Sequence, residues 1–338
     1  MMKVVQVDKP GSIEIVEKPI PVPKRGEALL KIKYCGICGS DLAVYTGNQP
    51  FATYPRIPGH EFSAEIVEIE ENDLGLEKGM IVTANPYFNC GKCYSCRKGK
   101  VNCCEDNKTM GVQRDGAFSQ YITMPIERIY LGKGLDAKQL ALIEPFTIGY
   151  HASNRGNIQE GEKVLVLGAG AIGTFAMLSA KLKGAKVYIA DFIETRLDNA
   201  LSLGADGIIN LKEEDLFDRV KEITNGDGMD TVMEAVGIPQ SFLNAIEAVS
   251  FGGKIILIGN GSKETTFNHS ILLKKEVDVY GSRNSLNDFV PLIDYINSGK
   301  VNIDSMITNI YDFENSIDAF QDLLSNPSDK LKVLIKFD

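Results

Sequence analysis

The stretch Lys163-Val164-Leu165-Val166-Leu167-Gly168-Ala169-Gly170-Ala171-Ile172-Gly173 decides the fold of nearly half of this chain. It places G-x-G-x-x-G between an apolar run typical of a buried strand and helix-forming sequence that continues to Lys183. The first glycine of such a loop permits a tight turn, the second lets a pyrophosphate approach, and the third allows close helix packing. The helix N-terminus adds free amides and the positive end of a dipole. We therefore predict a dinucleotide-binding loop, with Gly168, Gly170, Ile172 and Gly173 as candidate cofactor-binding residues.

A second apolar run, Lys186–Ala190, ends in Asp191, which lies 18 residues after Gly173. The acid that binds the cofactor ribose is expected at about this distance. A carboxylate there accepts hydrogen bonds from the ribose hydroxyls and repels a 2′-phosphate, which predicts NAD rather than NADP. Arg196 is a further candidate that would favour NADP, but its position five residues into the next helical segment is more typical of a surface residue.

The pattern of apolar residues changes along the chain. Between about residues 149 and 286, short apolar runs alternate with segments of helix length, which predicts a parallel, doubly wound α/β sheet. Residues 1–148 instead show short alternating runs punctuated by Gly and Pro, which predicts an antiparallel β domain. The six runs expected as parallel strands are Lys163–Leu167, Lys186–Ala190, Gly207–Asn210, Asp230–Ala235, Lys254–Ile258 and Val277–Tyr280.

The C-terminal segment carries two expected helices, Asp288–Asn297 and Phe313–Leu324, and a last strand, Leu331–Phe337. This segment is too small to bury a core of its own, so we expect it to pack on the first β domain. The predicted organisation is therefore a discontinuous β-rich domain, residues 1–148 and 287–338, and a Rossmann NAD-binding domain, residues 149–286.

Composition excludes several classes of protein. The 338 residues are 44% hydrophobic and 24% charged, which is ordinary for a globular protein and excludes a disordered or collagen-like chain. The net charge of −9 argues against sequence-independent binding of nucleic acid, which needs a surplus of Lys and Arg. There is no run of about 18 apolar residues and no signal-peptide pattern, so we expect no membrane span and a cytoplasmic protein. In that compartment clustered thiols hold metals more often than they form disulfides.

Five of the seven cysteines fall between residues 90 and 104. Four of them are spaced Cys-x2-Cys-x2-Cys-x7-Cys, which predicts a closed, structural zinc site with four thiolate ligands. The alternative is a disulfide loop or unrelated buried thiols. Cys103 and Cys35 are interpreted as bystanders, and Cys35 as a small buried residue at the end of a strand. The four predicted ligands are Cys90, Cys93, Cys96 and Cys104.

A second set of metal-ligand residue types precedes the dinucleotide loop. Cys38 follows a predicted strand, His60-Glu61 begins another, and Glu144 stands before a proline. Taken singly, each is more typical of a packed histidine or a solvated turn. Their joint occurrence predicts an open zinc site with three protein ligands and one position for substrate. His151, near the start of the second domain, is interpreted as structural packing.

These residues resemble a known family. The Gly36–Asp41 segment, Gly59-His60-Glu61, the four spaced cysteines, Ile143-Glu144-Pro145 and the glycine loop are similar to zinc-dependent medium-chain alcohol dehydrogenases, in family order over essentially the whole chain. The resemblance extends to the branch of sorbitol dehydrogenases and bacterial L-gulonate, L-galactonate and L-idonate 5-dehydrogenases. It implies a GroES-like catalytic domain beside the Rossmann domain, an active site in the cleft between them, a structural and a catalytic zinc in each subunit, and a homodimer or homotetramer.

The resemblance also implies residue roles. Cys38 and His60 match the two constant ligands of the catalytic zinc, and either Glu61 or Glu144 supplies the third. Ser40 matches the hydroxyl that hydrogen-bonds the substrate oxygen. The family's usual relay histidine is replaced by Ala43, so the proton must leave through Ser40, the nicotinamide ribose and water, or through Tyr45.

The implied reaction is hydride transfer between NAD and a secondary hydroxyl of a sugar acid or polyol. Tyr45 and Arg283 are candidate substrate residues, because an arginine after the last Rossmann strand could clamp a carboxylate. Their alternatives are ordinary packing for Tyr45 and contacts with hydroxyls or a domain bridge for Arg283. The alternative functions are a neutral polyol or polyol-phosphate dehydrogenase, L-threonine dehydrogenase, and a non-catalytic protein that binds NAD and zinc.

Overall fold

The computed structural model describes residues 1–337, which form two compact units. Unit 1 comprises Met1–Glu144, Phe289–Gly299 and Met306–Asp338, and unit 2 comprises Pro145–Asp288 and Lys300–Ser305. Within the described residues, no helix has both the length and the apolar character needed to cross a bilayer. Helix α4 (Ile143–Arg155) carries the chain from one unit into the other, and Glu144 in its first turn is the last residue of that part of unit 1.

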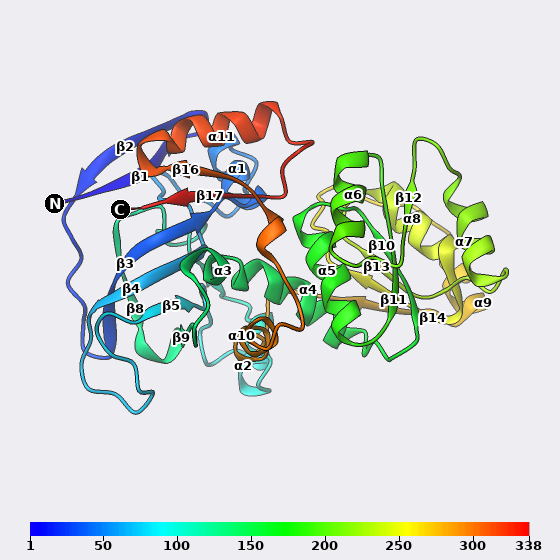
Figure 1. The fold of residues 1–338 in the computed structure, drawn as a ribbon, viewed down its shortest axis with the longest axis horizontal. Helices are drawn as coiled ribbons and strands as arrows, with labels where there is room; N and C mark the ends of the chain where they lie inside the picture. The colour runs from blue at the N-terminus through cyan, green and yellow to red at the C-terminus, as the bar shows by residue number, and fades with distance from the viewer. Residues whose placement is uncertain (338) are drawn as a thin grey trace. The chain divides into compact units, whose positions relative to one another are not determined.

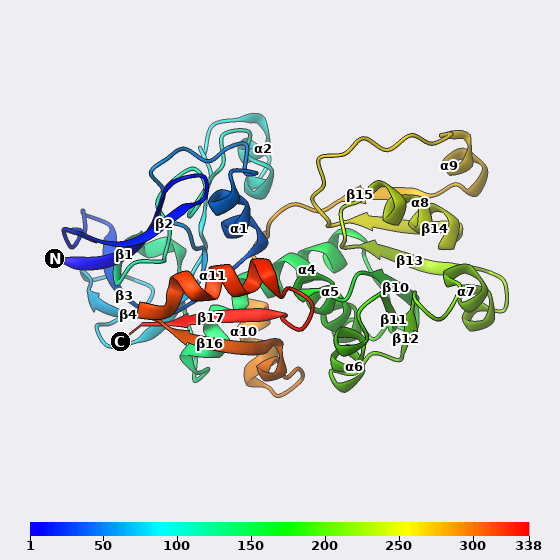
Figure 2. The same cartoon turned by 90° about the horizontal axis from the view of Figure 1, so that it is seen from above.

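Unit 2 is built on a parallel sheet of six strands, in the order β12-β11-β10-β13-β14-β15 (Figures 1 and 2). This is the strand order of a Rossmann fold, so the predicted doubly wound sheet is confirmed. The central strands are apolar because residues on both of their faces are buried. The strands are β10 (Lys163–Leu167), β11 (Lys186–Asp191), β12 (Gly207–Asn210), β13 (Met229–Glu234), β14 (Val249–Leu257) and β15 (Asp278–Gly281).

The helices of unit 2 connect these strands. From β10 the chain runs to one edge of the sheet through α5 and α6, and from β13 it runs to the other edge through α8 and α9. Because such crossovers are right-handed, the two sets of helices cover opposite faces of the sheet. The helices are α5 (Ala171–Leu182), α6 (Glu194–Ser202), α7 (Leu216–Thr224), α8 (Pro239–Ala248) and α9 (Ser270–Lys275).

Unit 1 contains a sheet of seven strands in the order β16-β17-β3-β4-β5-β9, with β8 also paired to β3 (Figure 1). Two small antiparallel pairs, β1–β2 and β6–β7, complete its strands. The strands are β1 (Met2–Lys9), β2 (Ser12–Lys18), β3 (Glu27–Gly36), β4 (Glu61–Glu68), β5 (Ile81–Ala84), β6 (Tyr87–Phe88), β7 (Lys108–Thr109), β8 (Tyr121–Pro125), β9 (Ile129–Leu131), β16 (Ile307–Asp312) and β17 (Lys332–Lys336). The helices are α1 (Gly39–Thr46), α2 (Tyr94–Arg97), α3 (Ala137–Ala141), α10 (Phe289–Asn297) and α11 (Ser316–Ser325).

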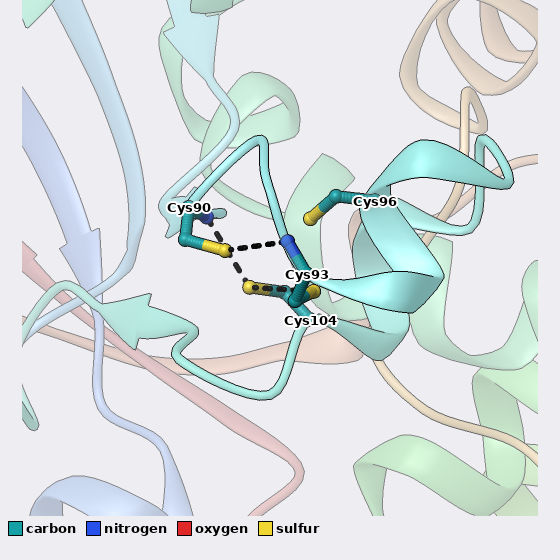
Figure 3. Close-up of side chains that lie close together, drawn as sticks. All are labelled: Cys90, Cys93, Cys96 and Cys104. Atoms are coloured by element: carbon teal, nitrogen blue, oxygen red, sulfur yellow. Dashed lines mark hydrogen bonds between the residues drawn. The ribbon is translucent and has the colours of Figure 1, made fainter.

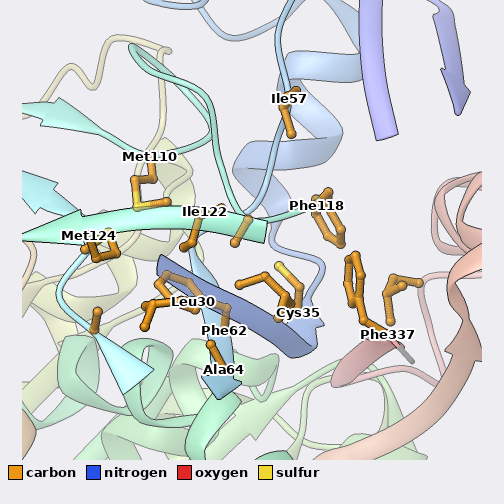
Figure 4. Close-up of a cluster of buried hydrophobic side chains, with 14 of the residues drawn as sticks. Leu30, Cys35, Ile57, Phe62, Ala64, Met110, Phe118, Ile122, Met124 and Phe337 are labelled. Carbon is orange, nitrogen blue, oxygen red and sulfur yellow. The ribbon is translucent and has the colours of Figure 1, made fainter. Parts of the chain in front are cut away.

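The core of unit 1 joins the two ends of the chain. Strand β17 pairs antiparallel with β3, and Leu334 lies opposite Gly36. Phe320, Val333 and Phe337 are buried in one cluster with residues from the first 130 positions of the chain. Figure 4 shows this cluster, with the Cys35 side chain inside it. The C-terminal segment therefore packs on the N-terminal β structure and shares its core.

Several element bounds differ from the expectations drawn from sequence. Strand β14 begins at Val249, five residues before the expected Lys254. Strand β16 was not expected at all, because it lies at the edge of its sheet, pairs with β17 only, and alternates between exposed and half-buried residues. Glu144 lies in the first turn of a helix and not in a turn before a proline.

Candidate metal and dinucleotide sites

The four spaced cysteines converge in the loop that contains α2 (Figure 3). Their sulfurs all lie within 4.8 Å of one another. The Sγ atoms of Cys93 and Cys104 are 3.9 Å apart, close to the ~3.8 Å between sulfurs that share a tetrahedral zinc with Zn–S bonds of about 2.3 Å. Backbone N–H groups donate to two of the sulfurs: that of Cys90 to Cys104 Sγ at 3.2 Å, and that of Cys93 to Cys90 Sγ at 3.3 Å. The cluster fits a closed structural zinc site.

The pKa values of three of these thiols are shifted, in different directions. A hydrogen bond from Ser95 and backbone N–H groups lower the pKa of Cys93 to about 5. Backbone hydrogen bonds from Lys92 and Cys93 also lower the pKa of Cys90, whereas burial raises the pKa of Cys104 to about 11. Cys103 is exposed and does not belong to this set, and Cys35 is fully buried in the core of unit 1.

A second cluster joins Cys38, His60 and Glu61, with ligand atoms within 4.8 Å of one another. Cys38 lies between the end of β3 and the start of α1, and Glu61 begins β4. Strands β3 and β4 pair with Gly36 opposite Glu61, so the two loops that carry the side chains meet at the same end of the sheet. The three residues come together because of strand register and not because of sequence proximity.

Asp41, which the sequence analysis did not single out, ties the two loops together. Its carboxylate is fully buried and accepts hydrogen bonds from the backbone N–H groups of Cys38 and Gly59, each at 2.8 Å. Its Oδ1 also lies 3.6 Å from His60 Nδ1. Asp41 therefore fixes the spacing between the two loops that carry the cysteine and the histidine, and its carboxylate faces the imidazole ring.

Glu61 lies over a glycine and pairs with a lysine from the far end of the sequence. A Cβ atom at Gly36 would collide with Glu61 Oε2, so only glycine leaves room for this carboxylate. Lys332 of β17 forms an ion pair with Glu61 Oε1, and the side chains of the two residues are 3% and 1% exposed. Glu61 Oε2 is buried without a hydrogen-bond partner among residues 1–337. That oxygen is a buried acceptor that a metal ion would satisfy.

Glu144 is the second buried carboxylate near this cluster. The Tyr87 hydroxyl, on β6, donates a hydrogen bond to Glu144 Oε1. Burial, reinforced by the neighbouring Glu61, raises the pKa of Glu144 to about 7. Burial and the same Glu144 carboxylate raise the pKa of Tyr87 well above its usual value. Tyr87 and Lys332 gave no signal in the sequence, because each reaches the cluster only through the fold.

The electrostatics of the second cluster fit a divalent cation. Burial opposes the charged form of His60, but Asp41 and Cys38 outweigh it and raise the pKa of the imidazole well above its usual value. Burial likewise opposes a charged Lys332, and Glu61 and Cys38 raise its pKa. The cluster thus attracts positive charge, and its sulfur, nitrogen and oxygen donors are the set that zinc accepts with one position left open.

The glycine loop has the backbone geometry of a phosphate-binding turn. Gly168 adopts a φ of 96°, which favours glycine, and a Cβ at Gly173 would collide with the carbonyl of Gly168. At Gly170, by contrast, the nearest atom to an added Cβ is Arg196 Nη1 at 3.9 Å. The second glycine therefore faces open space, while the third packs tightly between helix and strand. Ile172 lies in the first turn of α5.

Asp191 ends β11 beside this loop. Its Oδ2 accepts a hydrogen bond from the Ala169 N–H at 2.6 Å, and its Oδ1 accepts one from the Ile193 N–H at 2.9 Å. The carboxylate is therefore anchored to the loop that precedes α5. Arg196 lies on α6 with its guanidinium near Gly170, closer to the loop than a purely surface position would place it.

The remaining candidates have the following surroundings. Ser40 is half-buried in the first turn of α1, two residues after Cys38. The Tyr45 ring packs edge-on against Phe320, with centroids 6.2 Å apart. Arg283 is exposed just after β15 in unit 2. His151 is buried, and its Nδ1 lies 3.3 Å from a carboxylate oxygen of Asp288.

Comparison with known proteins gives the family. Residues 24–133 match the alcohol dehydrogenase GroES-like domain, and residues 171–298 match the zinc-binding dehydrogenase domain. The chain is 35% identical over 337 residues to L-galactonate-5-dehydrogenase of Escherichia coli K12, with 99% of each chain covered. It is 34% identical over 342 residues to sorbitol dehydrogenase of Bacillus subtilis, with 99% of this chain and 97% of the relative covered.

Two crystal structures extend the comparison to cofactors. An alcohol dehydrogenase from E. coli CFT073 in complex with NADH has a TM-score of 0.92 and 33% identity, with 99% of each chain covered. A zinc-binding dehydrogenase from Sinorhizobium meliloti 1021 bound to NADP has a TM-score of 0.92 and 28% identity, also with 99% of each chain covered. This chain belongs to the zinc-dependent medium-chain alcohol dehydrogenase family, whose GroES-like and Rossmann domains it contains. It is an oxidoreductase of that family.

Proposed function

We propose that this protein catalyses NAD-linked oxidation of a secondary hydroxyl in a sugar acid or polyol, of the L-gulonate, L-galactonate or L-idonate 5-dehydrogenase type. The observation that carries the proposal is the cluster of Cys38, His60 and Glu61, within 4.8 Å of one another, in a chain that also carries a glycine loop on a Rossmann sheet. The similarity to L-galactonate-5-dehydrogenase supports the substrate class.

We propose that the chain binds two zinc ions, each through a separate set of ligands. Cys90, Cys93, Cys96 and Cys104 would hold a structural zinc, and Cys38, His60 and a glutamate would hold a catalytic one. When bound, the catalytic zinc polarises the substrate hydroxyl, and NAD accepts the hydride. Asp41 keeps the cysteine and histidine in register. Ser40 is proposed to accept the proton of the substrate hydroxyl while it passes its own proton outward through the nicotinamide ribose and water, or through Tyr45, since Ala43 has no titratable group.

The glycine loop would hold the cofactor. Gly170 leaves space for a pyrophosphate, Ile172 and the start of α5 provide backbone amides, and Asp191 would accept hydrogen bonds from the ribose. Arg196, near Gly170, is proposed to contact the phosphates. We propose NAD as the preferred cofactor because the Asp191 carboxylate would repel a 2′-phosphate. A similar protein binds NADP, so the preference should be measured with both cofactors.

Arg283 and Tyr45 are retained as proposed substrate residues. Arg283 is the candidate clamp for a sugar-acid carboxylate, and Arg283→Met should raise KM for L-gulonate and L-idonate much more than for sorbitol. An equal loss with acidic and neutral substrates would contradict the clamp. Tyr45→Phe should change turnover only if its hydroxyl takes part, because the phenyl ring preserves the packing against Phe320.

A neutral polyol dehydrogenase is the second candidate, favoured by the relation to sorbitol dehydrogenase of B. subtilis. The deciding experiment is a steady-state screen of L-gulonate, L-galactonate, L-idonate, sorbitol and L-threonine with NAD and with NADP, on protein whose zinc content has been measured. Cys38→Ser is the matched control, because it removes one proposed catalytic ligand and leaves the four-cysteine site intact. The proposal fails if zinc-loaded protein forms no NADH with any of these alcohols.

We also propose a homodimer or homotetramer in the cytoplasm, built from domains 1–148 with 287–338 and 149–286. Support for association comes from unit 2, where β15 is an edge strand of the sheet and Val279 on it is exposed. Leu273 and Phe251 add exposed apolar side chains on the neighbouring α9 and β14. Open edges and apolar surface of this kind favour association between chains. Light scattering of the purified protein would give the number of subunits.

A further inference from the structure

The site holds two buried carboxylates, and the fold gives each of them a different partner. Glu61 is paired through Oε1 with Lys332, which leaves its Oε2 without a hydrogen-bond partner among the described residues. Glu144 is held through Oε1 by the hydroxyl of Tyr87. Only Glu61 belongs to the compact group formed with Cys38 and His60.

Tyr87 is itself firmly placed. Its backbone N–H donates to Asn85 Oδ1 at 2.9 Å, its carbonyl accepts a hydrogen bond from Arg128, and β6 pairs with β7. Glu144, at the other end of the contact, lies in the first turn of a 13-residue helix and is 2% exposed. A short tether between two rigid elements restricts where the Glu144 carboxylate can move.

This restriction matters because a zinc with three protein ligands has a single position for substrate. A second mobile carboxylate next to the metal would fill that position. We propose that Tyr87 is a positioning residue that holds Glu144 outside the coordination sphere, so that Glu61 is the third ligand and the fourth position stays open. This inference rests on the proposed function, because it assumes that Cys38, His60 and Glu61 bind zinc.

The test is Tyr87→Phe, which removes one hydroxyl and keeps the ring. Without the Tyr87 hydroxyl, the Glu144 carboxylate should reach the metal and block substrate. Zinc should therefore leave the variant more slowly in a chelator challenge, while kcat/KM for the best alcohol falls, because Glu144 occupies the position that substrate needs. General damage to the site would instead speed zinc release. Slower zinc release together with lower kcat/KM would therefore identify a positioning role for Tyr87.

Cobalt substitution provides a spectroscopic readout. The visible d–d bands of Co²⁺ change in energy and intensity when a carboxylate takes the open position of the site, and the four-cysteine site cancels in a difference spectrum between variant and wild type. The matched control is Tyr311→Phe, which removes another tyrosine–carboxylate hydrogen bond of unit 1, to Asp322 at 2.5 Å. We expect a difference spectrum for Tyr87→Phe and none for Tyr311→Phe.

Glu144→Gln and Glu61→Gln give a second measurement that does not depend on Tyr87. The spectrum of cobalt-loaded Glu144→Gln should match wild type, and that of Glu61→Gln should differ. A wild-type spectrum for Tyr87→Phe, or a changed one for Glu144→Gln, overturns the inference. If wild-type protein binds only one metal per chain and Cys38→Ser does not alter its content, the proposed function fails instead.

Discussion

Asp41 offers the sharpest test of how the candidate catalytic site is held together. Its fully buried carboxylate accepts two backbone hydrogen bonds of 2.8 Å, from the two loops that carry Cys38 and His60. Asp41→Asn preserves the shape of the side chain, but an NH2 group replaces one carboxylate oxygen. That NH2 group faces a backbone N–H and cannot accept a hydrogen bond from it. One hydrogen bond to a charged acceptor is lost and a buried donor is left unpaired, which should cost about 2–4 kcal/mol.

The same substitution should weaken metal binding. Groups that orient metal ligands typically change metal affinity about 10–100-fold when they are replaced. We therefore expect Asp41→Asn to release one of its two zinc ions at a chelator concentration about 10–100-fold lower than wild type requires. Its melting temperature should fall by ~5–15 °C, given about 2–4 °C per kcal/mol for a domain of this size.

The matched control is Asp215→Asn. Asp215 also accepts two backbone N–H bonds, from Phe217 at 2.9 Å and Asp218 at 3.0 Å, but it does so at the exposed start of α7. Asparagine caps a helix about as well as aspartate, so this variant should stay within about 0.5 kcal/mol of wild type. Wild-type zinc retention and melting temperature in Asp41→Asn would refute the role given to Asp41.

Three further predictions concern other parts of the chain. Asp191→Ala should lower the ratio of kcat/KM for NAD to that for NADP about 10–100-fold, the value of a lost charge-assisted hydrogen bond, and an unchanged ratio would contradict the cofactor assignment. Gly36→Ala should lose the zinc of the cysteine–histidine–glutamate cluster, whereas Gly39→Ala, which has open space around its Cβ, should keep both zinc ions in elemental analysis. Hydrogen bonds lower the pKa of Asp322 to about 2, and the largest contribution comes from the Tyr311 hydroxyl. The stability that these hydrogen bonds contribute is therefore present above pH ~4 and is lost as the pH falls toward 2. The difference in melting temperature between wild type and Tyr311→Phe should therefore shrink over that interval, and a constant difference would show that the carboxylate charge is not involved.

Local sequence patterns were enough for the parts of the protein that lie within one continuous segment. The glycine loop joins β10 to α5 as expected, and four cysteines within fifteen positions meet because short loops between them leave little room for anything else. The six parallel strands were found within a few residues of their positions, since a doubly wound sheet alternates strand and helix in a regular order. The edge strand β16 was missed because its residues are half-exposed and lack a clear apolar pattern.

The surroundings of the candidate catalytic ligands were determined by tertiary structure alone. Lys332 reaches Glu61 across 271 residues of sequence because Leu334 is in register with Gly36, and Gly36 with Glu61. A slip of one residue in either pairing would turn a side chain to the opposite face of the sheet.

The sequence by itself determined the family, the Rossmann sheet, the phosphate-binding loop and the ligand types at both metal clusters, because each depends on residue identity and short-range spacing. Only the tertiary structure distinguished the two carboxylates, giving Glu61 to Lys332 and Glu144 to Tyr87. Those pairings depend on strand register and on the packing of distant elements, and no local pattern encodes either.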